Sequence, residues 1–159
     1  MLRKVTLAWS ATESDTETPD AMLVAFASGD RTHVDQHFGA AEGFVLYAID
    51  ASRARLAGVM EFPAEAMDGN ENKLADKIDA LRGCAAMYCL AVGGSAVRQL
   101  TAAGIQPVRV ESRQPIEVLL AALRDAVREG GVPWVDRILR RSQTDDGRFD
   151  RMEEEGWQE

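Results

Sequence analysis

The chain has 159 residues, of which 46% are hydrophobic, and its formal net charge at pH 7 is -8. This length fits one domain with tails, and the hydrophobic content is enough for a core that needs no disulfide or metal. The net negative charge makes nucleic acid and anionic membranes poor partners. Any anion site would need local positive charge or backbone N–H donors.

Membrane insertion and secretion are not expected either. No apolar run approaches the ~20 residues of a membrane span, and the opening MLRKVTLAWSATESD lacks the long apolar stretch of a signal peptide. The only two cysteines, Cys84 and Cys89, are too few for a disulfide scaffold. A cytoplasmic protein with reduced thiols is therefore predicted.

Residues 1–20 predict an N-terminal arm. Within it, residues 11–20 contain four acids and no base among Thr, Ser and Pro, a composition typical of a flexible linker. The preceding Val5–Trp9 is a candidate short strand.

Apolar runs rich in β-forming residues then predict five strands. The first and fourth runs, MLVAFAS and AAMYCLAV, are almost entirely apolar, as expected of central strands buried on both faces. A short turn joins the second and third strands, which indicates an antiparallel hairpin. The five strands are Met22–Ser28, Gly43–Asp50, Arg55–Phe62, Ala85–Val92 and Ile105–Val110.

Helices are predicted between the later strands. Apolar residues repeat at helical spacing over Leu74–Leu81, and Gly83 follows as a stop signal. The pair Gly93-Gly94 predicts a tight turn, after which Ser95 is expected to cap a helix over Ala96–Ala103.

A third helix is expected over Pro115–Val127, with the proline at its first position, and a fourth short one over Pro133–Arg141. The order β-β-β-α-β-α-β-α predicts an α/β fold. Its mixed five-stranded sheet would be ribonuclease-H-like, with strand order 3-2-1-4-5. The expected organisation is a flexible arm (1–20), one domain (21–130), and a short helix followed by an acidic tail (131–159).

Candidate ligand residues gather at one predicted edge of this sheet. Ligands of open α/β sheets bind beyond the carboxyl ends of strands whose connections leave in different directions. The loop Gly29–Gly39 carries both histidines, His33 and His37, and Cys89 lies near the end of the strand that leads to Gly93–Ser95. Imidazole and thiolate are ligands that iron–sulfur clusters accept.

Positive charge at this edge would favour an anionic cluster. The amides of Gly93, Gly94 and Ser95 would lie at a helix N-terminus, where anions bind well. Arg31 and Arg98 are expected to add charge beside them.

Each of these residues also has a plainer interpretation. Cys89 lies in a core strand and is equally well explained as an inert buried thiol. His37 could bond a backbone carbonyl, and His33 could be an exposed polar residue. Asp35 either caps a turn or orients His37. The two glycines at 93 and 94 could serve the turn alone.

Other chemistries fit the sequence less well. The central strands contain no carboxylates, so a metal-dependent nuclease is disfavoured. The spacing of Cys84 and Cys89 is not that of a dithiol redox motif, and V-G-G-S-A lacks a complete dinucleotide-binding G-x-G-x-x-G.

Two long stretches resemble the dinitrogenase iron–molybdenum cofactor-binding domain family. They are VAFASGDRTHVDQHFGAAEGFVLYAID and NENKLADKIDALRGCAAMYCLAVGGSAVRQLTAAGIQPVRV. The family's V-D-Q-H-F-G signature corresponds to Val34–Gly39. The resemblance covers residues 22–130, and the tail RFDRMEEEGWQE is similar to the end of one subfamily.

This resemblance implies a ribonuclease-H-like domain that is not an enzyme. It implies transient binding of iron–sulfur or iron–molybdenum cofactor precursors and their transfer between the cluster-building protein and the scaffold of nitrogenase cofactor assembly. His37 corresponds to the signature histidine and Cys89 to the cysteine of a Y-C motif, so both are the expected metal ligands. Some relatives have a further thiol where this chain has Leu90. The full candidate set is Arg31, His33, His37, Cys89, Gly93, Gly94, Ser95 and Arg98.

Two other functions stay open at this point. One is a metal-free interaction or regulatory module of nitrogenase assembly, in which the acidic arm and tail contact partner proteins. From Thr144 onward the tail has seven acids and two arginines. The other is a small α/β enzyme that acts on a phosphorylated metabolite at the Gly-Gly-Ser turn. The sequence leaves the oligomeric state undetermined.

Overall fold

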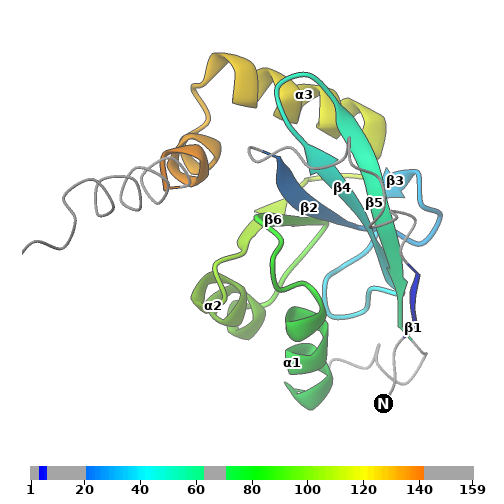
Figure 1. Ribbon diagram of the computed structural model, residues 1–159. Helices are drawn as coiled ribbons and strands as arrows, with labels where there is room; N and C mark the ends of the chain where they lie inside the picture. The colour runs from blue at the N-terminus through cyan, green and yellow to red at the C-terminus, as the bar shows by residue number, and fades with distance from the viewer. Residues whose placement is uncertain (1–3, 7–20, 63–70, 142–159) are drawn as a thin grey trace, which may run out of the picture.

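A mixed six-stranded sheet with helices on both faces forms the centre of the molecule in a computed structural model that describes residues 4–6, 21–62 and 71–141 (Figure 1). The pairs β2–β6 and β6–β7 are parallel, and the others are antiparallel. Across the sheet the strands are β1 (Lys4–Thr6), β5 (Ala54–Glu61), β4 (Gly43–Ile49), β2 (Met22–Ala27), β6 (Ala86–Cys89) and β7 (Gln106–Arg109).

The predicted α/β architecture and its five strands are therefore present, and the sheet gains one strand. Residues 4–6 of the expected arm pair with β5, so this part of the arm extends the edge of the sheet. The rest of the predicted arm, 1–3 and 7–20, and the predicted acidic tail from residue 142 lie outside the described residues.

Side-chain alternation along β2 divides the core into two layers. Val24 and Phe26 point to one face of the sheet, and Ala25 and Ala27 point to the other, as the period of two in a strand requires. All four are fully buried. The alanine face is covered by α1 (Glu71–Ala80) and α2 (Gly94–Ala102). The other face is covered by α3 (Ile116–Glu129) and the helical residues 133–141.

Two predicted helix starts are wrong by one or two residues. Gly93 is the N-cap of α2 in an extended conformation, with no side-chain cap. Ser95 therefore lies inside the first turn, where its hydroxyl accepts a hydrogen bond from Gln99 Nε2 at 3.1 Å. Pro115 precedes α3 as its N-cap instead of occupying the first helical position, because it is extended and pairs with another segment.

That pairing forms a small second sheet, which the sequence pattern did not reveal. Strand β3 (His33–Val34) pairs antiparallel with β8 (Gln114–Pro115). Strands of two residues are too short to show periodicity. The pairing anchors the loop after β2 to the start of α3.

No described helix is both long and apolar enough to span a bilayer.

Candidate functional site

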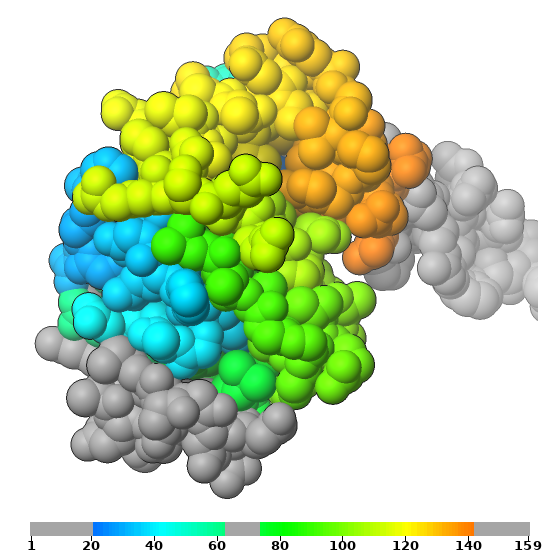
Figure 2. Space-filling model, turned by 180° about the vertical axis from the view of Figure 1, so that it is seen from behind, coloured from blue at the N-terminus to red at the C-terminus, as the bar shows by residue number. Residues whose placement is uncertain are grey.

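The loop of residues 28–42 crosses the ends of two central strands. Its backbone bonds to the segment that follows β6: the Phe38 N–H donates to the Ala91 carbonyl at 2.8 Å, and the Leu90 N–H donates to the Gln36 carbonyl at 2.9 Å. Figure 2 shows the blue-to-cyan loop directly beside the green segment. The loop after β2 and the segment after β6, expected to converge from the sequence, are therefore in contact.

The first three residues of the V-D-Q-H-F-G signature have structural partners. Val34 is fully buried. The Asp35 Oδ1 accepts a hydrogen bond from the Gly29 N–H at 2.9 Å, and the Gln36 Oε1 accepts one from the Glu42 N–H at 2.8 Å. Of the two predicted roles for Asp35, the structure thus shows the cap of a turn. These bonds fold the loop back on itself.

The last two signature residues, Phe38 and Gly39, are fixed by contacts in the core. The Phe38 ring is fully buried, with its centroid 5.7 Å from that of Phe44. The Lys77 Nζ donates a hydrogen bond to the Gly39 carbonyl at 2.7 Å and one to the Phe38 carbonyl at 3.4 Å. The signature turn is therefore fixed by an aromatic anchor and by an amino group from α1.

The sequence pattern contains a signal for Lys77, which was not among the predicted site residues. It lies three residues after Leu74 and one before Ile78, on the same apolar stripe of α1. A lysine on a buried stripe needs polar partners in the core, because an unpaired amino group there is costly.

His37 differs from its neighbours in the signature. It is the one exposed residue among residues 34–39. Its side chain makes no hydrogen bond or ion pair with the part of the chain that the structure describes. Its imidazole is consequently available to an external ligand.

His33, four residues earlier, is part of a polar cluster. Its Nδ1 lies 2.8 Å from the Thr32 hydroxyl and 3.3 Å from the Asp30 carboxylate, which also accepts a hydrogen bond from Arg113 at 3.0 Å. The Thr32 N–H, and less strongly the His33 N–H and Arg113, hold the pKa of Asp30 well below its usual range. His33 thus helps tie the loop to the segment before β8.

The structure places Cys89 in the core. It is fully buried and packs within the layer that contains Phe38. Burial raises the pKa of Cys89 to about 11, although the Ala91 N–H, the charge of Arg109 and the Phe38 N–H lower it in part. The side chain is therefore a neutral thiol at pH 7, and it is not presented on the surface beside His37.

Cys84 is a second buried thiol. Burial raises its pKa to about 12. Within the described ranges, no three His, Cys, Asp or Glu side chains are grouped so as to hold a metal ion.

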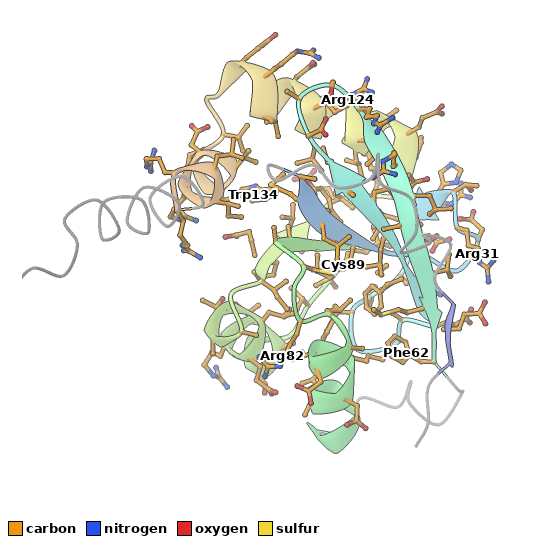
Figure 3. The ribbon with its side chains drawn as sticks, in the orientation of Figure 1. Arg31, Phe62, Arg82, Cys89, Arg124 and Trp134 are labelled. Carbon is orange, nitrogen blue, oxygen red and sulfur yellow. The ribbon has the colours of Figure 1, made fainter. Side chains whose placement is uncertain are left out.

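The expected position of Arg31 is wrong. Arg31 forms an ion pair with Glu61 of β5 and lines a cavity of about 300 Å³ between the start of the loop and strands β4 and β5. Figure 3 shows Arg31 beside β5, toward the opposite edge of the sheet from α2. The loop turns back after Gly29, which carries Arg31 toward β5 and away from the N-terminus of α2.

The other residues of the predicted anion site are close to one another. Gly93 and Gly94 are exposed at the N-terminus of α2. A Cβ placed on Gly94 would lie 3.7 Å from Arg98 Nη1, so this guanidinium reaches back over the first turn. Arg98 is therefore the one predicted arginine that lies where the sequence placed it.

Fold and site together define a small α/β domain with an exposed imidazole on a firmly held loop. The family model described as dinitrogenase iron–molybdenum cofactor matches residues 20–126. NifX of Azotobacter vinelandii is 48% identical over 147 residues, which cover 91% of this chain and 93% of that protein. NifX of Klebsiella pneumoniae is 37% identical over 141 residues, 86% of this chain and 85% of that protein.

Among solved structures, the apo form of the orange protein from Desulfovibrio gigas has a TM-score of 0.50 at 20% identity. The match covers 68% of this chain and 89% of that one, and it concerns the fold alone. The chain belongs to the dinitrogenase iron–molybdenum cofactor family, and the resemblance found in the sequence is confirmed.

Proposed function

We propose that this protein takes part in nitrogenase iron–molybdenum cofactor biosynthesis by holding a cofactor precursor reversibly at the His37 loop. Membership of the family supports this process. One observation supports the location: of the six signature residues 34–39, His37 alone is exposed and lacks a hydrogen-bond partner among the described residues. The other five build the turn that presents it.

The charge of the folded part is compatible with an anionic cargo. The described residues contain 15 lysines and arginines and 13 aspartates and glutamates, a net charge of +2, although the whole chain has -8. The acidic excess therefore belongs to the remaining segments. The repulsion expected from the net charge of the chain does not apply to the described domain taken alone.

A single imidazole suits reversible binding. A thiolate holds iron more tightly than a neutral nitrogen ligand, but Cys89 is buried and its pKa is raised to about 11. Cys89 remains the proposed second metal ligand, and it can reach the cargo only if the backbone of 36–38 separates from that of 90–91. One ligand would then receive the cargo, and a second would become available when the loop lifts.

The proposed anion contacts are Arg98 and the backbone amides of Gly93, Gly94 and Ser95. Arg31 and His33 are left out of this set because the structure engages Arg31 with Glu61 and His33 with Asp30.

The remaining features of the proposal follow from the family. We propose a cytoplasmic binding protein that is not an enzyme and that exchanges cargo with the cluster-building protein and the scaffold. The parallel pairs β2–β6–β7 beside an antiparallel hairpin support a ribonuclease-H-like sheet. Residues 21–130 would form the cofactor-binding domain, flanked by the arm and the tail.

The test is an anaerobic titration of the purified protein with isolated iron–molybdenum cofactor, followed by visible and electron paramagnetic resonance spectra. Wild type should bind saturably, and His37→Ala should raise the dissociation constant about tenfold or more, the loss of ~1.4 kcal/mol of binding free energy. His33→Ala is the matched control, because it removes an imidazole from the same loop and should leave binding unchanged. Equal binding by wild type and His37→Ala would show that the cofactor does not bind through His37.

A metal-free interaction module is the second candidate. The burial of Cys89 and the lack of a grouped metal-ligand set in the described residues favour it. Failure of wild type to bind isolated cofactor, together with retained binding to assembly proteins, would establish this alternative.

A further inference from the structure

A lysine is buried beneath the turn that presents His37. Lys77 is 1% exposed, although it lies on a ten-residue helix with an exposed face where a lysine would be unconstrained. Burial of an amino group costs free energy unless it is hydrogen-bonded, and ordering so long a side chain costs further entropy. A position that bears both costs has a specific role in the structure.

Two partners of Lys77 are the carbonyls that directly follow His37 in the chain. Its Nζ donates to the Phe38 carbonyl at 3.4 Å and to the Gly39 carbonyl at 2.7 Å. The same nitrogen lies 5.6 Å from the centroid of the Phe62 ring, close enough for a cation–π contact. Figure 3 shows Phe62 near α1, at the base of this layer.

Backbone hydrogen bonds hold the opposite side of the turn. The Phe38 N–H donates to the Ala91 carbonyl, and the Gln36 carbonyl accepts from the Leu90 N–H. His37 is thus enclosed between residues that are tied to the end of β6 and to α1. Its own side chain has no hydrogen bond to the described residues, so its direction depends on the backbone conformation of the turn.

We infer that Lys77 is a positioning residue for His37: its amino group clamps the carbonyls of Phe38 and Gly39 and thereby sets where the imidazole points. The inference deepens the proposed function and rests on it only for the cofactor readout. It also means that α1, a helix distant in sequence from the signature, contributes to the site without contacting the cargo.

The test uses the full-length protein without cargo and then with it. Lys77→Met removes the donors and keeps an unbranched apolar chain. Hydrogen exchange at the Phe38 amide should become at least about tenfold faster, because that amide then opens locally. The imidazole resonances of His37 should shift, while the amides of β2 stay protected. Lys77→Arg retains donors and should restore part of the wild-type pattern.

Ile78→Val is the matched control for lost packing. Ile78 is the next residue of α1 and is buried in the same layer. The variant therefore loosens the core and leaves the hydrogen bonds of Lys77 to the Phe38 and Gly39 carbonyls in place. It should leave the His37 resonances and the exchange at Phe38 unchanged. In titrations with isolated iron–molybdenum cofactor, Lys77→Met should weaken binding toward the level of His37→Ala, and Ile78→Val should not.

The positioning role of Lys77 and the proposed function would be overturned by different results. A folded Lys77→Met with wild-type His37 resonances and wild-type exchange at Phe38 overturns the inference. If Lys77→Met does not fold, Lys77→Gln gives the same test, because its shorter amide cannot span both carbonyls, and unchanged resonances there overturn the inference as well. If wild type binds no cofactor, the proposed function fails, while the measurements without cargo still decide the positioning role.

Discussion

The two halves of the loop after β2, residues 28–34 and 35–42, each contain a histidine, and the two side chains have different environments. In the first half, His33 is partly buried and its Nδ1 lies within a cluster with Thr32 and Asp30. In the second half, His37 is exposed and has no hydrogen bond to the described residues. Two histidines four residues apart thus differ in availability, because each half of the loop is anchored to a different part of the molecule.

The anchors also differ in physical kind. The first half is held by the β3–β8 pairing and the buried Val34, together with exposed polar contacts such as the Arg113–Asp30 ion pair, whose side chains are 57% and 39% exposed. Exposed ion pairs contribute little and weaken in salt. The second half is held by the buried Phe38 and by Lys77 from the core. The half that presents the exposed imidazole therefore has the larger buried anchor, an aromatic ring and an amino group where the first half has a valine.

Loss of the Phe38 ring should reduce stability most. Phe38→Ala should lower the free energy of unfolding by about 3–5 kcal/mol, because it removes a buried aromatic ring and leaves a cavity. Urea denaturation measures this difference. Val118→Ala on α3 is the control, since Val118 is 55% exposed and its truncation should change stability by less than about 0.5 kcal/mol. A similar small change for Phe38→Ala would show that the second half is not anchored through its ring.

The next effect concerns the thiol beneath the second half. Because burial raises the pKa of Cys89 to about 11, its thiolate fraction at pH 7 should be about a hundredfold or more below that of an ordinary cysteine. In a Cys84→Ala background, reaction with a disulfide reagent should be correspondingly slow in the folded protein and fast in guanidinium. Rapid labelling of the folded protein would mean that the second half opens readily.

A smaller effect separates the two imidazoles by their contribution to stability. His33→Ala should cost about 1 kcal/mol, because it removes hydrogen-bond partners in the Asp30 cluster. His37→Ala should change stability by less than about 0.5 kcal/mol, as expected for an exposed side chain without contacts. Both values come from urea denaturation under one set of conditions. The reverse order would invalidate the comparison of the two halves.

The smallest effect is the pH dependence of stability that arises from Asp30 in the first half of the loop. The pKa of Asp30 in the folded state is held below its unfolded value of about 3.9, so its contribution to stability is present above about pH 4. This contribution is lost as the pH falls below that value toward the folded pKa. Unfolding free energies at pH 7, 4 and 3 should therefore decline less steeply for Asp30→Asn, and Arg113→Gln should reduce the same slope. An unchanged slope in both variants would show that Asp30 does not contribute to the pH dependence of stability.

Much of the fold was predictable because its signals are local. The central strands are continuous apolar runs, and α3 shows an apolar stripe, so burial itself produces the pattern that reveals them. The short pairing of β3 with β8 was not predictable. It depends on contacts between residues about eighty positions apart, and two-residue strands have no period. Strand β1 falls between these cases, since the sequence indicated a short strand but not its partner.

The convergence of the two candidate loops was predictable, and the surroundings of their side chains only in part. The contact between 36–38 and 90–91 follows from strand order, so the sequence placed the loop correctly. The sequence did not show whether Cys89 faces a ligand or the core, because a thiol suits either setting. Arg31 was misplaced because the loop folds back through the bonds of Asp35 to Gly29 and of Gln36 to Glu42.

The family, the α/β architecture and the loop that carries the signature can be recognised without any coordinates, because hydrophobic periodicity and the order of motifs are properties of the chain. Which signature side chain is available becomes apparent in the folded chain. Availability depends on partners that come from distant segments: Lys77 of α1 beneath the turn, Ala91 beside it, and Arg113 at the other half. Hydrogen bonds and burial are set by those long-range contacts, which leave His37 exposed and place Cys89 in the core.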